Sequence, residues 1–284
     1  SVRALVTDLA TNTVTSALST TSGQITVDTT APTVGTLTLD TDNGSSNSDG
    51  IVGTLTPAFT LATASDTAYT GTGHPTAAIA SVVVQVSTDN GGTWTTKGTS
   101  SSTSSPYAIT LSGLTSQTTY KIQALVTDVA GNSATTLLST TSGLVTVDTT
   151  APTAGTVTMT TSDPGSDGIV NTLTPAFALA MTGTSDGSYT GSGSNATGIS
   201  SVVLQVNDGT TGWVDNATFT APSGGGTAYT VTAAALTSGT TYSVRALVTD
   251  LATNTVTSAL STTSGQITVD TTAPTVGTLT LDTD

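Results

Sequence analysis

Apolar and polar residues alternate along most of this chain, in short runs separated by polar, glycine-rich turns. An alternation with a period of two places every second side chain on one face of a strand. Threonine and valine are frequent in these runs, and their branched side chains favour the pleated strand. Within one stretch of the chain, the runs predict strands at 34–40, 79–89, 107–114, 119–128 and 137–147, and one more strand held within 51–65, with Pro57 near its entry. Short strands at this spacing indicate an all-β fold of the β-sandwich type.

The segments between the runs refine this prediction. Asn90-Gly91-Gly92 is a hairpin-type turn, and residues 129–136 are expected to form a loop. Leu114, Thr118 and Tyr120 follow the spacing L-x-x-x-T-x-Y, which recurs at Leu236, Thr240 and Tyr242. This spacing resembles the tyrosine corner of immunoglobulin-like and fibronectin type III sandwiches, in which the hydroxyl bonds back to the preceding turn. Because aromatic residues are few, Trp94 and Trp213 are also expected in the core or at corners.

The chain repeats itself at two scales. The sequence Asp-Thr-Thr-Ala-Pro-Thr begins at Asp28, Asp148 and Asp270, and residues 1–42 are identical to residues 243–284. A fixed period of this length indicates an array of equivalent domains, of which we expect this chain to be one window. The predicted domains are the last strands of a preceding repeat (1–28), two complete immunoglobulin-like repeats (29–148 and 149–270) and the first strand of a following repeat (271–284).

Charge and composition limit the partners. The 284 residues include 18 acidic side chains, all aspartate, against four Lys plus Arg, which gives a net charge of -14. Such an acidic chain is not expected to bind nucleic acid or anionic membranes. No apolar run is long enough for a membrane span in this segment. We also expect no enzyme, because Cys and Glu are absent and the single histidine, His74, is replaced by Ser194 in the second repeat.

Aspartates gather in one loop of the first repeat. Asp40, Asp42 and Asp49 lie within ten residues, together with Asn43, Asn47 and glycines that allow tight turns. Calcium binds several hard oxygen ligands at about 2.3–2.6 Å, and such a loop offers them. The alternative is a solvated acidic turn. The second repeat is two residues shorter here, so a calcium site in it is expected to be weaker or absent.

A second type of cluster follows from the expected topology. In an immunoglobulin-like strand order, the B–C and F–G loops lie at the pole that receives the incoming linker. The first such pole would combine Asp28, Asp66, Asp128 and Asn132, and the second would combine Asp148, Asp186, Asp250 and Asn254. Carboxylates gathered in this way repel one another unless a cation joins them. The alternative is that the linker is only stiffened by its proline.

Four motifs in the same order carry a family resemblance. LDTDNGSSNSDGIVGTLTPAFTL, STDNGGTWT, YKIQALVTDVAGN and VDTTAPT resemble the bacterial immunoglobulin-like tandem repeats of giant surface adhesins, including the extender repeats of RTX-type adhesins. The resemblance covers the whole chain. It implies an elongated, secreted stalk of stacked sandwiches on the bacterial cell surface, often stiffened by calcium at the junctions.

The sequence therefore predicts a structural spacer in an extracellular adhesin or fibre, with calcium as its cofactor and neighbouring repeats of the same chain as its partners. Two alternatives remain. Short Thr-x-Thr rows could form a face that binds polysaccharide or ice. The exact 242-residue period also suits lateral self-association into a filament or sheath.

Overall fold

The structure is a computed structural model that describes residues 2–18, 25–66, 78–139, 143–163, 167–186, 198–221, 227–262 and 264–281. The described residues contain strands and no helix. By their contacts they divide into two compact units. The first unit comprises Ser1–Thr41, Thr56–Leu114 and Tyr120–Val145, and the second comprises Asp42–Leu55, Thr115–Thr119 and Thr146–Asp284. The domain boundaries expected at 28, 148 and 270 stay a prediction.

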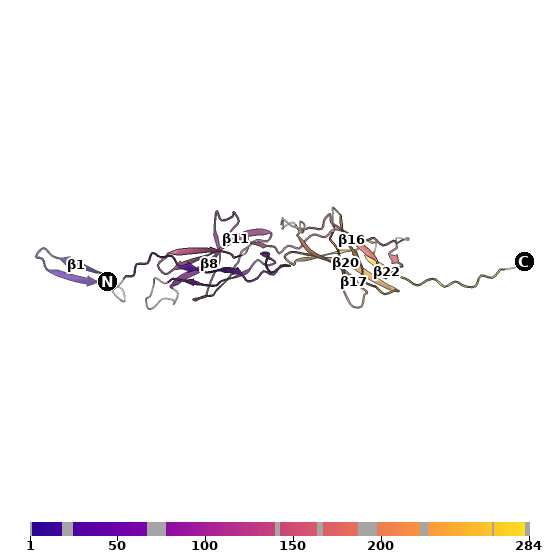
Figure 1. Ribbon diagram of the computed structural model, residues 1–284, viewed down its shortest axis with the longest axis horizontal. Helices are drawn as coiled ribbons and strands as arrows, with labels where there is room; N and C mark the ends of the chain where they lie inside the picture. Colours follow the sequence, from indigo (N-terminus) through magenta and orange to yellow (C-terminus); the bar gives the residue numbers. More distant parts are fainter. Residues whose placement is uncertain are drawn as a thin grey trace. The chain divides into compact units, whose positions relative to one another are not determined.

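The strands follow the order expected from the hydrophobic pattern (Figure 1). The chain begins with a two-stranded hairpin of β1 (Arg3–Thr7) and β2 (Thr13–Ala17). It continues with β3 (Thr33–Val34), β4 (Leu37–Leu39), β5 (Ile51–Val52), β6 (Ala58–Leu61), β7 (Ala64–Ser65), β8 (Ile79–Ser87), β9 (Thr95–Thr99), β10 (Tyr107–Thr110), β11 (Thr118–Asp128), β12 (Ser133–Leu137) and β13 (Leu144–Val147). The second repeat contains β14 (Val157–Met159), β15 (Ile169–Val170), β16 (Ala176–Ala180), β17 (Ile199–Asn207), β18 (Val214–Thr218), β19 (Ala228–Thr232), β20 (Thr240–Asp250), β21 (Thr255–Ala259) and β22 (Gln266–Val269).

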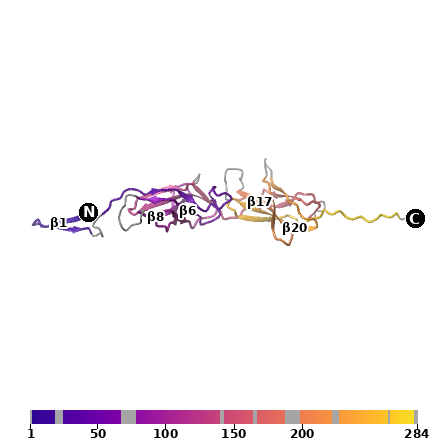
Figure 2. The same cartoon turned by 60° about the horizontal axis from the view of Figure 1, so that its bottom comes forward.

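Each repeat forms a small and a large sheet. In the second repeat the small sheet has the order β14-β16-β19, and the large sheet has the order β15-β22-β20-β17-β18 with β21 beside β20. The first repeat gives the same arrangement, β10-β6-β4 and β5-β13-β11-β8-β9 with β12 beside β11, plus a short β3-β7 pair. The long central strands β8 with β11, and β17 with β20, can be followed in Figures 1 and 2. The fold is all-β, as predicted.

The core of the second repeat lies between its two sheets. Phe177 and Leu179 of the small sheet belong to one buried cluster with Leu204, Val244 and Val248 of the large sheet. The burial alternates along β20, so that every second side chain reaches this core. The hydroxyl of Tyr242 accepts a hydrogen bond from the Thr237 backbone N–H at 3.1 Å. The predicted tyrosine corner is therefore present in the second repeat.

Two local predictions were wrong, and one was incomplete. Residues 51–65 hold the expected strand as β6, but they also hold two short strands, β5 and β7, and the three belong to three different sheets. Residues 129–136 are not all loop, because β12 pairs with the end of β11. Trp213 is not buried: it is 38% exposed, and the guanidinium of Arg245 lies 4.0 Å from its ring centroid.

Candidate metal centres

An Asp-x-x-x-Asn loop begins at the last residue of β11, which is Asp128, and at the last residue of β20, which is Asp250. Asp128 Oδ1 accepts hydrogen bonds from the backbone N–H groups of Ala130 and Asn132 at 2.8 and 2.9 Å. Asp128 Oδ2 accepts one from the Asn132 side-chain amide at 3.0 Å. The pair Asp250 and Asn254 forms the same bonds, and so does the pair Asp8 and Asn12 in the exposed hairpin. The loop therefore depends on its own five residues more than on its surroundings.

The asparagine also holds the incoming linker. The Asn132 side-chain amide donates to the carbonyl oxygen of Asp28 at 3.3 Å, and that of Asn254 donates to the carbonyl oxygen of Asp148 at 3.2 Å. Each asparagine thus joins the linker backbone to the aspartate that ends strand β11 or β20. The sequence suggested these asparagines only as ligands, and their role as linker clamps was missed. The spacing Asp-x-x-x-Asn was the available signal.

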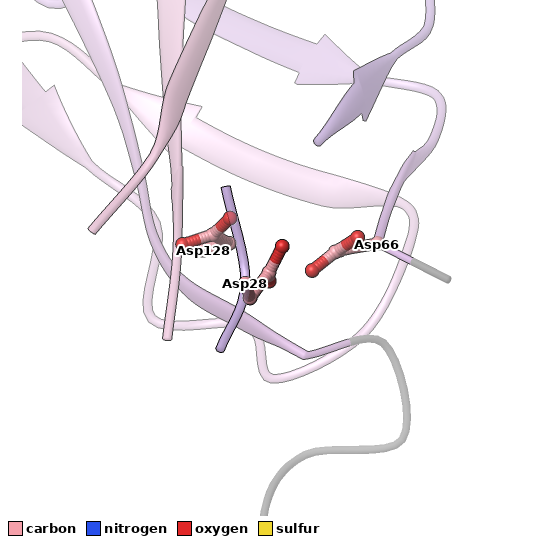
Figure 3. Close-up of side chains that lie close together, drawn as sticks. All are labelled: Asp28, Asp66 and Asp128. Carbon is pink, nitrogen blue, oxygen red and sulfur yellow. The ribbon is translucent and has the colours of Figure 1, made fainter. Parts of the chain in front are cut away.

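The first cluster combines three carboxylates in the first unit. Asp28 comes from the linker, Asp66 follows β7, and Asp128 ends β11. One oxygen atom of each lies within 4.8 Å of the others. Figure 3 shows the Asp28 side chain between those of Asp66 and Asp128. Asp28 Oδ1 caps the Thr30 backbone N–H at 2.9 Å, whereas Asp28 Oδ2 is buried without a hydrogen-bond partner.

The second cluster repeats this arrangement within the second unit. Oxygen atoms of Asp148, Asp186 and Asp250 also lie within 4.8 Å of one another. All three residues are buried, and Asp250 is fully buried. Asp148 Oδ1 caps the Thr150 backbone N–H at 2.9 Å, as Asp28 does for Thr30. The two clusters therefore have the same composition and the same backbone contacts.

Burial changes the proton affinity of these groups. Desolvation, together with the hydrogen bonding and charge of Asp186, raises the pKa of Asp148 to about 6. Desolvation also raises the pKa of Asp250, although the bonds from Asn254 act against it. At Asp128 desolvation acts in the same direction, but the bonds from Asn132 and Ala130 outweigh it and the pKa is lowered. The second cluster is thus the one in which negative charge is less well tolerated.

The spacing of the carboxylates fits one hard cation. Two ligands on opposite sides of a calcium ion are about 4.6–5.2 Å apart, because each bond is about 2.3–2.6 Å long. Oxygens that all lie within 4.8 Å of one another can therefore share one ion. The donors are carboxylates without nitrogen or sulfur, and the buried Asp28 Oδ2 has no protein donor. The chemistry of the donor set suits calcium or another oxygen-liganded cation.

The acidic loop at 40–49 is arranged differently. Asp40 accepts a hydrogen bond from the Thr60 hydroxyl at 2.6 Å. Asp42 accepts the Gly50 backbone N–H, and Asp49 accepts that of Ile51. Among the described residues, these three aspartates are not part of a group whose oxygens converge as in the two clusters above. Asp42 Oδ1 is buried without a hydrogen-bond partner, as Asp28 Oδ2 is, and the calcium site expected in this loop stays a prediction. His74 and Ser194 lie outside the described residues.

Comparisons with known proteins add little beyond the fold. No protein-family model and no curated protein matches the sequence. Similar solved structures include the FN1–FN3 domains of chicken CNTN1, with 10% identity and a TM-score of 0.36, covering 89% of this chain and 75% of that one. A marsupial T cell receptor has 9% identity and a TM-score of 0.46, covering 82% and 73%.

A third similar structure is the Bacteroides ovatus mixed-linkage glucan utilization locus protein SGBP-B, solved in complex with a mixed-linkage heptasaccharide. It has 16% identity and a TM-score of 0.24, and the match covers 86% of this chain but 48% of that one. In the part of this chain that the structure describes, no helix has the length and apolar character to cross a membrane. The fold, defined by its own sheets, is an all-β sandwich.

Proposed function

We propose that this chain is a structural spacer, a stretch of the stalk of an extracellular bacterial adhesin or fibre, and that its two carboxylate clusters bind calcium. The observation that carries the proposal is the pair of clusters, each of which joins a linker aspartate to two loop aspartates within 4.8 Å. A protein whose task is length needs defined connections between its repeats, and these clusters lie where a linker meets a sandwich.

Calcium would act on the linker. Without a cation, three carboxylates at one place repel one another and tend to separate. The linker proline fixes only one dihedral angle, so Asp28 could still move away from the loops. An ion shared by Asp28, Asp66 and Asp128 would hold the linker against β11 and against the segment after β7. The same reasoning applies to Asp148, Asp186 and Asp250 in the second unit.

A catalytic role is not part of this proposal. Proton transfer or nucleophilic attack needs a base, acid or nucleophile held next to a substrate cavity. The clusters contain only carboxylates, and Asp128 and Asp250 are occupied in holding their own loops. We therefore assign the clusters to cation binding and to positioning of the linker.

Calorimetry tests the proposal on the whole chain. The protein is freed of metal with a chelator, and calcium is then titrated in while the heat of binding is recorded. We expect two sites and a rise in melting temperature at unchanged circular dichroism, because a ligand that binds only the folded state stabilises it by mass action. Small-angle scattering should show a more extended particle with calcium. No binding heat and identical scattering in calcium and chelator would contradict the proposal.

Matched variants assign the sites. Asp128→Ala should remove one binding site and leave the one at Asp250, and Asp250→Ala should do the reverse. Magnesium serves as a control ion, because it is smaller and demands a stricter octahedral geometry. If both variants still bind two calcium ions, the metal lies elsewhere and the assignment is wrong.

Binding of a polysaccharide is a second candidate function. Thr160, Thr218, Thr220, Thr230 and Thr232 line an open hollow beside Phe177 in the second repeat. Phe177 itself is buried, so the hollow offers its threonine hydroxyl groups to a sugar. Binding to a panel of immobilised glucans would support this function, provided that Thr230→Val weakens it. If the chain binds none of these glucans, the spacer function is the remaining proposal.

A further inference from the structure

A close contact within the second unit involves two segments that are far apart in the sequence. The segment 42–53 packs against the loop 250–254. The Ser45 backbone N–H donates to the Leu251 carbonyl oxygen at 2.7 Å. Ile51, Leu251 and Ala252 form a small apolar cluster and are 4%, 9% and 1% exposed. This contact joins the first sequence repeat, which contributes the segment, to the second, which contributes the loop.

Two glycines make this contact possible. A Cβ atom on Gly53 would lie 2.6 Å from the Ala252 carbonyl oxygen. A Cβ atom on Gly44 would lie 2.6 Å from the Leu251 carbonyl oxygen. Both obstacles are backbone atoms, so they cannot turn away as a side chain could. Any residue other than glycine would push the segment and the loop apart.

The corresponding segment of the second repeat lacks these features. Asn171 stands where the first repeat has Gly53. The stretch from Thr161 to the Asp-Gly-Ile-Val that begins at Asp167 is two residues shorter than the stretch from Thr41 to Asp49 in the first repeat. If a loop packed on this segment as the loop 250–254 packs on 42–53, the Asn171 side chain would collide with the backbone of that loop. This segment therefore needs a loop of another shape.

The loops also come in two kinds. The loop 250–254 reads Asp-Leu-Ala-Thr-Asn, and residues 8–12 repeat it. The loop 128–132 reads Asp-Val-Ala-Gly-Asn, with Gly131 at a φ of 96° where the other kind has a threonine. Because residues 1–42 are identical to 243–284, the repeat before residue 29 is of the second kind. Within this chain, the segment 42–53 is thus followed by a loop of the Asp-Leu-Ala-Thr-Asn kind.

We propose that the 42–53 segment and the Asp-Leu-Ala-Thr-Asn loop are a cognate pair, so that a repeat of the first kind accepts only a repeat of the second kind after it. The exposed loop 8–12, in which Leu9 is fully solvent-accessible, has the same sequence as the loop that this segment accepts. The segment ending at Asn171 accepts the Asp-Val-Ala-Gly-Asn loop. This selectivity explains why the period is 242 residues, two repeats, and it does not depend on calcium.

Hydrogen exchange of the full-length chain tests the contact. Gly53→Asn installs the residue that the other repeat carries, and it should speed exchange of the Ser45 amide at least tenfold. Asn171→Gly is the matched control and should leave the Ser45 amide unchanged. The amides of the β17–β20 ladder report whether the sandwich is still folded. If Gly53→Asn were to disturb the fold, Gly53→Ala provides a smaller side chain and should give a smaller loss of protection.

A swap of both partners tests the selectivity. Replacing residues 42–53 by the sequence of 162–171 should expose the loop 250–254 to exchange. Changing the loop as well, with Leu251→Val and Thr253→Gly, should restore its protection. Restoration supports the cognate pair. If Gly53→Asn keeps Ser45 protected, or if the double swap exchanges as fast as the single swap, the proposed selectivity is wrong.

Discussion

The clusters at Asp28 and at Asp148 each contain three aspartates in equivalent positions and an asparagine that clamps the linker, yet the two clusters differ in their surroundings. Asp28 is partly exposed, whereas Asp148 is 2% exposed. The second cluster lies beside the contact of segment 42–53 with loop 250–254, and a Cβ on Gly53 would lie 3.9 Å from the Asp148 carbonyl oxygen. In the first unit the equivalent loop residue Val129 is half-buried and Ala130 is exposed, since the described residues include no counterpart of segment 42–53 ahead of this repeat.

The Asp-x-x-x-Asn loop occurs in three environments and separates local from tertiary effects. Asp8 lies in an exposed hairpin, and the bonds from Asn12 lower its pKa. The pKa of Asp128 is also lowered, whereas that of Asp250 is raised, although the hydrogen bonds are the same. The loop sequence therefore sets the geometry, whereas at Asp250 desolvation and the neighbouring charge of Asp186 make the negative charge more costly. A cation should matter most where the charge is most costly.

Removal of calcium is expected to have the largest effect. A ligand present at a hundred times its Kd stabilises the folded state by about 2.7 kcal/mol for each site. Asp28→Asn and Asp148→Asn are matched changes, because Oδ1 in each residue caps a backbone N–H and an amide oxygen can replace it. Each variant should lose one site in calorimetry and part of the rise in melting temperature with calcium.

The same two variants should differ in chelator. Asp148→Asn removes a charge from a buried group of three and should stabilise the calcium-free protein, whereas Asp28→Asn should leave it nearly unchanged. Differential scanning calorimetry in chelator measures both. Equal effects of the two substitutions would mean that the difference in burial has no energetic consequence.

Truncation of the loop side chains should have the next largest effect. Leu251→Ala removes a buried side chain from the cluster with Ile51 and should cost about 2 kcal/mol of the free energy of unfolding. Val129→Ala is the matched change in the first unit, and because Val129 is only half-buried it should cost about 0.5 kcal/mol. Urea denaturation measures both values. A Val129→Ala effect as large as that of Leu251→Ala would show that the first loop is covered as well.

Much of the fold could be predicted because burial leaves a period of two in the sequence. Strands such as β8 and β11 alternate between core and surface, and the sequence shows it. The strand β12 could not be found in this way, because its residues are exposed or half-buried and it is held by backbone pairing with β11. Trp213 was misplaced because an aromatic ring can also be covered by a cation, here Arg245, on the sheet surface.

The site could be predicted in part for a topological reason. The expected strand order places the loops after β7 and β11 at one pole, which is where the linker enters, so the grouping of Asp28, Asp66 and Asp128 followed. The packing of segment 42–53 on loop 250–254 could not be predicted, because it depends on how closely two backbones approach. The only trace in the sequence was the exchange of Gly53 for Asn171 between the repeats.

Loss of the linker clamp should have a smaller effect. Asn254→Ala removes the bonds to the Asp148 carbonyl oxygen and to Asp250 Oδ2, and it should cost about 1.5 kcal/mol in chelator. Asn132→Ala removes the equivalent bonds in a less buried site, so it should cost about 1 kcal/mol. Thermal unfolding in chelator measures both, and Asn12→Ala in the exposed hairpin is the control. A loss with Asn12→Ala that equals the other two would assign the effect to the loop alone and not to the linker.

Acidification of the calcium-free protein should give the smallest effect and should separate the clusters by its sign. The pKa of Asp148 in the folded protein is about 6, above the ordinary value of 3.8, so the folded state takes up a proton before the unfolded chain does. Stability should therefore rise as the pH falls from 7 towards 5. The pKa of Asp128 is lowered, so the contribution of Asp128 to stability is constant in this range and is lost only below about pH 4.

Asp148→Asn should abolish the rise in stability between pH 7 and 5, and Asp128→Asn should preserve it. Saturating calcium should reverse the trend, because protons then compete with the ion for Asp148. A melting temperature that falls steadily from pH 7 to 5 in chelator would contradict the assignment of buried repulsion to the second cluster.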